Sequence, residues 1–366
     1  MRETVRIPAG CAVTGILHQD GKRVSGDTII RSIAVMHERS NGLGGGFAAY
    51  GIYPEFAELR AFHVLYDDRG VVPDVEETIK RTFRIEKAED IPYRETAGIR
   101  DWPIFKRYFL SYRGESESEE DAVVRVVMEV NSRIDGAYVI SSGQNMGIFK
   151  GVGYPEDVGR FFRLEEYDAW CWTAHGRFPT NSVGWWGGAH PFGLLSWSVV
   201  HNGEISSYGI NRRYLQNFGY LCHLQTDTEV ITYLVDLLVR KHGIPMNRLG
   251  SVFASPFWEV IEQMEDPERS LHTLLRTIYG GALLNGPFSI IVGFQGGMFG
   301  MVDRIKLRPM VAAWKDECFY LSSEESAIRE IAPCLDRVVS LRAGEVVAGR
   351  VGEKVDHGHK LVVSGV

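Results

Sequence analysis

The pattern of apolar and polar positions along the chain predicts a protein of mixed strands and helices. Residues 11–19 (CAVTGILHQ) are largely apolar and favour a strand, and the segment from about Gly26 to His37 has the apolar spacing of a helix. Strands are expected again from Trp170 to Ile205. A further helix is expected to begin near Thr226, because Thr226 and Glu229 stand at capping-box spacing.

The segment 55–167 is more charged and alternates on its own between strand and helix patterns, which predicts an inserted α+β subdomain. The expected order is strand (AFHVLYD), helix (PDVEETIKRTF), strand (IFKRYFLSY) and helix (EDAVVRVVMEVNSRI), then a hairpin of AYVISS with GIFKG.

The stretch 278–302 carries no charged residue before its end and is long enough to cross a bilayer. However, it contains Gly280, Gly281, Gly286, Pro287 and the pair Gly296-Gly297, and these residues break helices. FSIIVGF and MFGMVD are therefore predicted to be two buried strands joined by a turn at residues 295–297, and no membrane span is expected.

Composition narrows the class of protein. The 366 residues carry a net charge of -7, which argues against a nucleic-acid-binding protein with a basic face. The charged N-terminus MRETVRIPAG lacks the apolar core of a secretory signal, so a cytoplasmic location is expected. Neither a metal nor a cofactor is expected in this chain. The cysteines lack the spacing of a metal site or a disulfide framework; they are Cys11, Cys171, Cys222, Cys318 and Cys334.

Several polar residues, taken singly, have ordinary structural explanations. Asn202-Gly203 between apolar runs is typical of a type I′ hairpin turn. Arg177 fits a surface ion pair, Asp227 fits the first turn of a helix, and Cys11 fits a small buried strand residue. The histidines at 175, 190 and 201 lack metal-ligand spacing and fit ordinary strand positions.

The order of these motifs changes that picture. Cys11 before a strand, then HERxNGxGG, HGRFPTN, AHPF, HNGEI and TDTEVI, resembles the class II glutamine amidotransferases, and most of all the amidotransferase domain of glutamate synthase. The resemblance covers 11–53 and 170–327 and leaves the insert unmatched. It implies an α+β fold, the four-layer αββα sandwich of N-terminal-nucleophile hydrolases, with the 55–167 subdomain inserted.

The resemblance also implies roles for five residues. Cys11 would be the nucleophile, and removal of residues 1–10 would free its α-amine to act as the base. The Asn202 side-chain amide and the Gly203 N–H would form the oxyanion hole. Arg177 would bind the α-carboxylate of glutamine in bidentate fashion and Asp227 its α-ammonium group. AHPF would support the HNGEI segment without a catalytic role.

The ammonia acceptor is a separate question. The chain has no SGGxDS-type pyrophosphate loop, no phosphoribosyl-binding acidic run, and no clustered cysteines for an iron–sulfur synthase domain. We therefore expect a glutaminase subunit that serves a separate, flavin-containing synthase, with glutamate synthase first and an N-methylglutamate synthase or another ammonia-using enzyme second. An N-terminal-nucleophile amidase for another amide, and a silent scaffold that keeps residues 1–10, stay open as alternatives.

Overall fold

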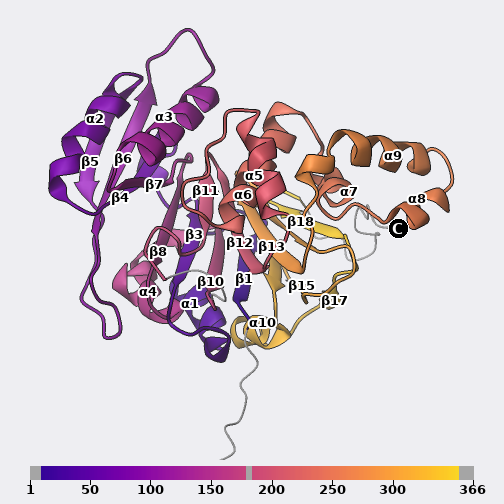
Figure 1. The fold of residues 1–366 in the computed structure, drawn as a ribbon. Helices are drawn as coiled ribbons and strands as arrows, with labels where there is room; N and C mark the ends of the chain where they lie inside the picture. Colours follow the sequence, from indigo (N-terminus) through magenta and orange to yellow (C-terminus); the bar gives the residue numbers. More distant parts are fainter. Residues whose placement is uncertain (1–9, 179–183, 354–366) are drawn as a thin grey trace, which may run out of the picture.

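Two stacked antiparallel β-sheets form the centre of the molecule in the computed structural model, which describes residues 10–178 and 184–353 (Figure 1). The larger sheet has the strand order β17-β15-β16-β1-β10-β3-β8, and the smaller has β11-β12-β13-β14-β18. The larger sheet consists of β1 (Ala12–His18), β3 (Gly45–Tyr50), β8 (Met146–Gly151), β10 (Cys171–Gly176), β15 (Val311–Lys315), β16 (Cys318–Ser322) and β17 (Arg337–Ser340). The smaller consists of β11 (Phe192–Leu194), β12 (Trp197–Gly203), β13 (Phe288–Phe294), β14 (Gly297–Val302) and β18 (Val346–Arg350).

The central strands are apolar on both faces because each face is covered. In β1, Val13 and Leu17 pack into the core between the two sheets, whereas Ala12 and Ile16 pack into the core under the helices. This alternation follows from the pleat of a strand, in which successive side chains point to opposite faces. β12 and β13 contribute Val200 and Ile291 to the same inter-sheet core.

Helices complete the outer layers. α1 (Asp27–Ala34), α4 (Pro155–Phe161) and α10 (Glu325–Ile331) cover the outer face of the larger sheet, and α6 (Asp227–Val235) covers β11 and β12 of the smaller one. α5 (Tyr208–Gln216) packs on α6, and α6 continues as a π-helix, Asp236–Lys241. This is the expected four-layer αββα arrangement. Thr226 caps α6 as predicted, since its Oγ1 accepts a hydrogen bond from the Glu229 N–H at 3.1 Å.

A separate antiparallel sheet with the order β5-β6-β4-β7 lies at one end of the molecule (Figure 1). Its strands are β4 (Arg60–Tyr66), β5 (Phe83–Asp90), β6 (Ile104–Tyr112) and β7 (Ala137–Ser141). α2 (Val72–Lys80) and α3 (Glu119–Arg133) pack against it. The first two strands and the two helices predicted for the insert are therefore confirmed, whereas β5, which begins where the predicted helix was expected to end, was not predicted.

The predicted hairpin at the end of the insert is wrong. β7 pairs with β4 of the separate sheet, whereas β8 pairs with β3 of the larger central sheet. α4 also packs on that central sheet, so the segment 146–167 belongs to the main layers and the separate unit ends near Ser141. Both strands are short and buried, and their sequences do not specify which neighbour each one pairs with.

The uncharged stretch 278–302 forms β13 and β14, which pair directly and confirm the predicted strands. None of the helices in the described ranges is long and apolar enough to cross a bilayer. The connection from β12 to β13 carries α5 and α6, then α7 (Leu249–Phe253), α8 (Trp258–Glu262) and α9 (Glu268–Ile278), the last three forming a lobe beside β18 (Figure 1). The short strands β2 (Val24–Ser25) and β9 (Asp168–Ala169) pair with each other.

Candidate active site

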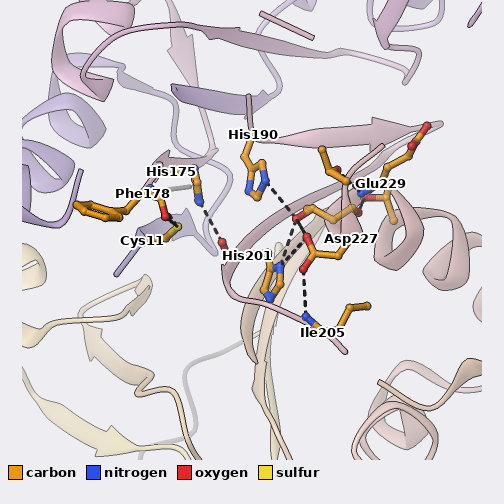
Figure 2. Close-up of polar contacts among 11 residues, drawn as sticks. Cys11, His175, Phe178, His190, His201, Ile205, Asp227 and Glu229 are labelled. Atoms are coloured by element: carbon orange, nitrogen blue, oxygen red, sulfur yellow. Dashed lines mark hydrogen bonds and ion pairs between the residues drawn. The ribbon is translucent and has the colours of Figure 1, made fainter. Parts of the chain in front are cut away.

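Cys11 lies immediately before β1, at the end of the larger sheet where β10 also ends. The antiparallel register pairs Ala12 with Gly176, which brings Cys11 next to the segment that follows β10. The Cys11 Sγ accepts a hydrogen bond from the Phe178 N–H at 3.3 Å (Figure 2). Cys11 as a residue is partly exposed.

The surroundings of Cys11 do not by themselves create a thiolate. Burial raises the pKa of the Cys11 thiol, and the nearby Asp227 adds to this, whereas the Phe178 N–H, Arg177 and Arg308 lower it without cancelling the rise. A thiol of raised pKa is mostly protonated near neutral pH and needs a proton acceptor before it can attack an amide. Residues 1–9 lie outside the described part of the chain.

Arg177 follows β10 and is almost fully buried, with 4% of its surface exposed. Its N–H donates to the Gly44 carbonyl at 2.8 Å, and its carbonyl accepts from Ser40 Oγ at 3.1 Å. A Cβ added at Gly44 would stand 3.0 Å from Arg177 Cδ, which explains a glycine in the NGLGG segment. Burial lowers the pKa of Arg177, and the neighbouring Cys11 and Asp227 oppose this change, so all three groups lie within electrostatic reach of one another.

Asn202 and Gly203 do not form the predicted type I′ turn. They are the last two residues of β12, where they pair with Ser289 and Phe288 of β13, and residues 204–287 intervene between the strands. Gly203 has φ +148°, and a Cβ there would lie 2.0 Å from the Pro287 carbonyl oxygen. A glycine is therefore required at 203 because two backbone segments approach each other closely there. The sequence motif Asn-Gly between apolar runs looks the same in this arrangement and in a tight turn.

The Asn202 side chain is fully buried, and neither its Oδ1 nor its Nδ2 has a hydrogen-bond partner in the described structure. The pleat places Asn202 on the same face of β12 as Val200, which packs between the two sheets. By the same alternation Cys11 continues the face of Val13, which packs in the same layer. Asn202 thus presents an unpaired amide to the layer that contains the thiol.

Asp227 begins α6 and is held by three neighbours (Figure 2). Its Oδ2 accepts from the Ile205 N–H at 3.1 Å, and its Oδ1 lies 3.2 Å from Thr228 Oγ1 and 3.5 Å from His201 Nδ1. Burial favours the neutral acid, but His201 and these hydrogen bonds outweigh it and lower the pKa of Asp227. The carboxylate is therefore charged at neutral pH while 19% of the side chain remains exposed.

Three buried histidines, His175, His190 and His201, form a hydrogen-bonded and closely packed group next to Asp227. His175 Nε2 donates to the His201 carbonyl at 3.0 Å, and the rings of His175 and His190 lie 4.1 Å apart. Thr228 Oγ1 joins the group, at 3.2 Å from both His201 Nδ1 and His190 Nε2 (Figure 2). Burial lowers the pKa of His175 to about 3 and also lowers that of His190, so both rings are neutral. A supporting role fits them better than proton transfer.

Sequence reasoning missed two buried ionisable side chains, Lys150 and Glu229, that interact electrostatically. Lys150 in β8 is fully buried, donates from Nζ to the Gly187 carbonyl at 2.9 Å, and stands 4.1 Å over the Phe192 ring. Burial lowers the pKa of Lys150 to about 7, and burial raises the pKa of Glu229 in α6 to about 7. A single lysine in an apolar strand gives no sequence signal for such a partner, because Glu229 lies on a distant segment.

The structure thus brings Cys11, Arg177 and Asp227 together and places Asn202 and Gly203 at the end of a strand in the opposing sheet. Part of the RFPTN motif, residues 179–181, lies outside the described residues. In the described ranges, no group of three or more metal-ligating side chains is suitably placed for an ion. Two stacked antiparallel sheets between helical layers, with a cysteine at the start of a central strand, define the fold of an N-terminal-nucleophile hydrolase.

Comparison with known proteins gives the family. The chain belongs to the class-II glutamine amidotransferases, whose sequence model matches residues 100–341. That span includes Arg177, Asn202, Gly203 and Asp227 and begins after Cys11. Members of this family are enzymes that use glutamine as their substrate.

Individual relatives cover nearly the whole chain. A protein of Archaeoglobus fulgidus, described as uncharacterized, is 50% identical over 93% of this chain and 92% of its own length. A protein of Methanothermobacter thermautotrophicus, whose name suggests a glutamine amidotransferase, is 27% identical over 92% of this chain and 98% of its own. Among solved structures, glutamine phosphoribosylpyrophosphate amidotransferase from B. subtilis matches 95% of this chain and 50% of its own, with 13% identity and a TM-score of 0.47.

Proposed function

We propose that the chain hydrolyses L-glutamine to glutamate and ammonia through a thioester on Cys11. The observation that carries this proposal is the Asn202 amide, which is fully buried without a hydrogen-bond partner in the described structure. An unpaired buried amide costs about 1–3 kcal/mol of folding free energy, so a fold that keeps one is expected to use it. An oxyanion is a ligand that such a donor stabilises.

The proposed reaction proceeds in two stages, formation of a thioester and its hydrolysis. The Cys11 sulfur, after losing its proton, attacks the side-chain carbonyl carbon of glutamine, and the carbonyl oxygen becomes an oxyanion. The Asn202 Nδ2 and the Gly203 N–H donate to that oxygen. When the intermediate collapses, the C–N bond breaks and ammonia leaves with the proton taken from the thiol. Water then attacks the thioester, which releases glutamate and restores the thiol.

Substrate recognition is assigned to Arg177 and Asp227. The buried guanidinium of Arg177 can bind the α-carboxylate through two parallel hydrogen bonds, and the charged carboxylate of Asp227 can pair with the α-ammonium group. Together they would distinguish a free amino acid from a glutamine within a peptide. The raised pKa of Cys11 supports the need for a base, and the α-amine of Cys11 fulfils that role once residues 1–10 are removed.

We also propose that the ammonia passes to a separate, flavin-containing synthase subunit, with glutamate synthase as the first candidate. The sequence features that support this are the missing pyrophosphate loop and the scattered cysteines. An N-methylglutamate synthase is the second candidate. Affinity capture from the native host followed by mass spectrometry would identify the partner, and recovery of a flavin-free ligase in its place would contradict this assignment.

The glutaminase proposal is tested by ammonia release from L-glutamine. The purified protein should produce equimolar glutamate and ammonia, Cys11→Ala should abolish the activity, and Cys334→Ala, at an exposed cysteine, should retain it. A short aliphatic amide such as butyramide should be a poor substrate, because it has neither group that Arg177 and Asp227 bind. Faster hydrolysis of butyramide than of glutamine would identify a different amidase.

A further inference from the structure

A cavity lies where the lobe of α7, α8 and α9 meets the loops beside β14 and β18, and no residue of the candidate active site lines it. Its volume is about 280 Å³, and its walls come from α7, from the segment before α8, and from the loops that follow β14 and precede β18. The lining residues that matter here are Ser251, Ala254, Phe257, His272, Arg304 and Arg342. None of the roles proposed for glutamine hydrolysis falls on any of them.

Two buried polar side chains in its wall have unmet hydrogen-bonding capacity. Ser251 and His272 are 2% and 8% exposed, and neither Ser251 Oγ nor His272 Nδ1 has a partner within the described ranges. The other ring nitrogen of His272 lies 3.7 Å from the Glu268 carboxylate. Both atoms are shielded from a water-sized molecule, so the charged and aromatic groups that face the cavity decide which ligand fits it.

The charge and shape of the cavity restrict that ligand. Arg304 and Arg342 both line it, and no described lining residue is acidic. Carboxylates beside the lining are already engaged: Glu345 accepts from the Arg342 N–H at 2.6 Å, and Glu268 faces His272 and forms an ion pair with Arg248. Asp303, which adjoins Arg304 in the chain, accepts from the N–H groups of its own loop. The two guanidinium groups of the lining therefore favour an anion.

The remaining walls favour a flat apolar body. The Arg304 guanidinium lies over the Phe257 ring at 4.4 Å, and Phe257 remains 40% exposed. Ala254 and Val260 add apolar surface. We propose that this cavity binds a small aromatic anion, whose carboxylate or phosphate group pairs with Arg304 and Arg342 and whose ring packs on Phe257.

The cavity is connected to the Cys11 site through Arg304. The Arg304 guanidinium contacts the Asn285 side chain, while the Asn285 carbonyl accepts from the Ser206 N–H at 2.7 Å and its N–H donates to Ser207 Oγ at 2.8 Å. Ser206 follows closely on Gly203, the proposed oxyanion donor. A ligand that pairs with Arg304 competes with its contact to Asn285, and Asn285 is hydrogen-bonded to the segment 206–207. Ligand binding should therefore alter the turnover of glutamine. Only this expected effect on turnover rests on the proposed function; binding of the ligand does not.

Binding is tested by isothermal titration calorimetry on the full chain with phenyl phosphate and benzoate as probes. Benzyl alcohol, which lacks the charge, and inorganic phosphate, which lacks the ring, are the comparators. Saturable binding of at least one probe, about tenfold tighter than either comparator, is expected from one charge-assisted contact plus ring burial. The stronger of the two probes identifies the anionic group. Absence of saturable binding of both probes up to about 10 mM, a conventional limit of weak binding, overturns the proposal.

Variants locate the site. Arg342 is exposed, so Arg342→Glu should fold normally and weaken binding about tenfold or more, whereas Arg100→Glu, on an exposed loop of the insert, should leave it unchanged. Val260→Phe, which fills the cavity without changing charge, should also weaken binding. Equal affinities for Arg342→Glu and Arg100→Glu, with unchanged melting temperatures, would place the probe elsewhere. Ammonia release measured with and without probe tests the coupling, and unchanged turnover at saturation would remove the coupling while leaving the site.

Discussion

Replacing Asn202 with leucine separates an oxyanion donor from a structural residue, because the two roles predict opposite changes in stability. Leucine has nearly the shape of asparagine and no polar atoms. Both polar atoms of Asn202 are buried and unpaired in the described structure, so their removal relieves a desolvation penalty. The free energy of unfolding should rise by about 1–3 kcal/mol. At roughly 2 °C per kcal/mol for a protein of this size, the melting temperature should rise by about 2–6 °C.

Turnover should change in the opposite direction. Loss of one oxyanion donor typically lowers kcat by about 10²–10³-fold, or about 2.7–4 kcal/mol of transition-state stabilisation. The Michaelis constant for glutamine should change little, since Arg177 and Asp227 contact the other end of the substrate. Asn202→Asp should lose both turnover and stability, because it places a carboxylate at a position with no exposed surface.

The assay measures kcat, the Michaelis constant and the melting temperature on the same preparation. Ser141→Ala is a matched control, because Ser141 Oγ is also buried without a partner in the described structure but lies in β7 of the separate sheet. It should leave kcat unchanged. The reasoning is refuted if Asn202→Leu keeps its turnover per folded molecule, or if it melts well below the wild type and thus identifies Asn202 as a packing residue.

Four further predictions concern the remaining groups. Arg177→Lys keeps the charge but loses the bidentate geometry, so the Michaelis constant for glutamine should rise by about tenfold or more in steady-state assays; an unchanged constant would remove Arg177 from the carboxylate site. The pKa of Asp227 is lowered, so the stability it contributes is present above the unfolded pKa and is lost only as the pH falls through the lower folded value. The Michaelis constant should therefore stay flat down to about pH 4, the ordinary Asp range, and a rise between pH 5 and 6 would contradict this charge state. Lys150→Met should lower the melting temperature, because it removes the buried amine that interacts electrostatically with Glu229, and adding Glu229→Gln should recover part of the loss; additive losses would disprove the coupling. Intact-mass measurement of active protein should give a chain that begins at Cys11, and full activity with residues 1–10 attached would refute the α-amine as base.

Local patterns were sufficient for much of the fold. The turn residues and apolar runs around 295–297 predicted β13 and β14, and the capping box at Thr226 predicted the start of α6. These features depend on neighbouring residues, which the sequence displays directly. The order of motifs from Cys11 to Asp227 indicated the family for the same reason, although the individual roles of these residues stay predictions.

Only the tertiary structure decided which distant segments meet. β8 joined the central sheet and not the hairpin predicted for it, because periodicity reveals that a strand is buried but not which edge it pairs with. Asn202 proved to end a strand, with Gly203 fixed by the Pro287 backbone and not by a tight turn. Lys150 and the cavity at Phe257 had no sequence signal at all. Burial and unmet hydrogen bonds depend on packing between segments far apart in the chain, so they exist only once the sheets and helices have assembled.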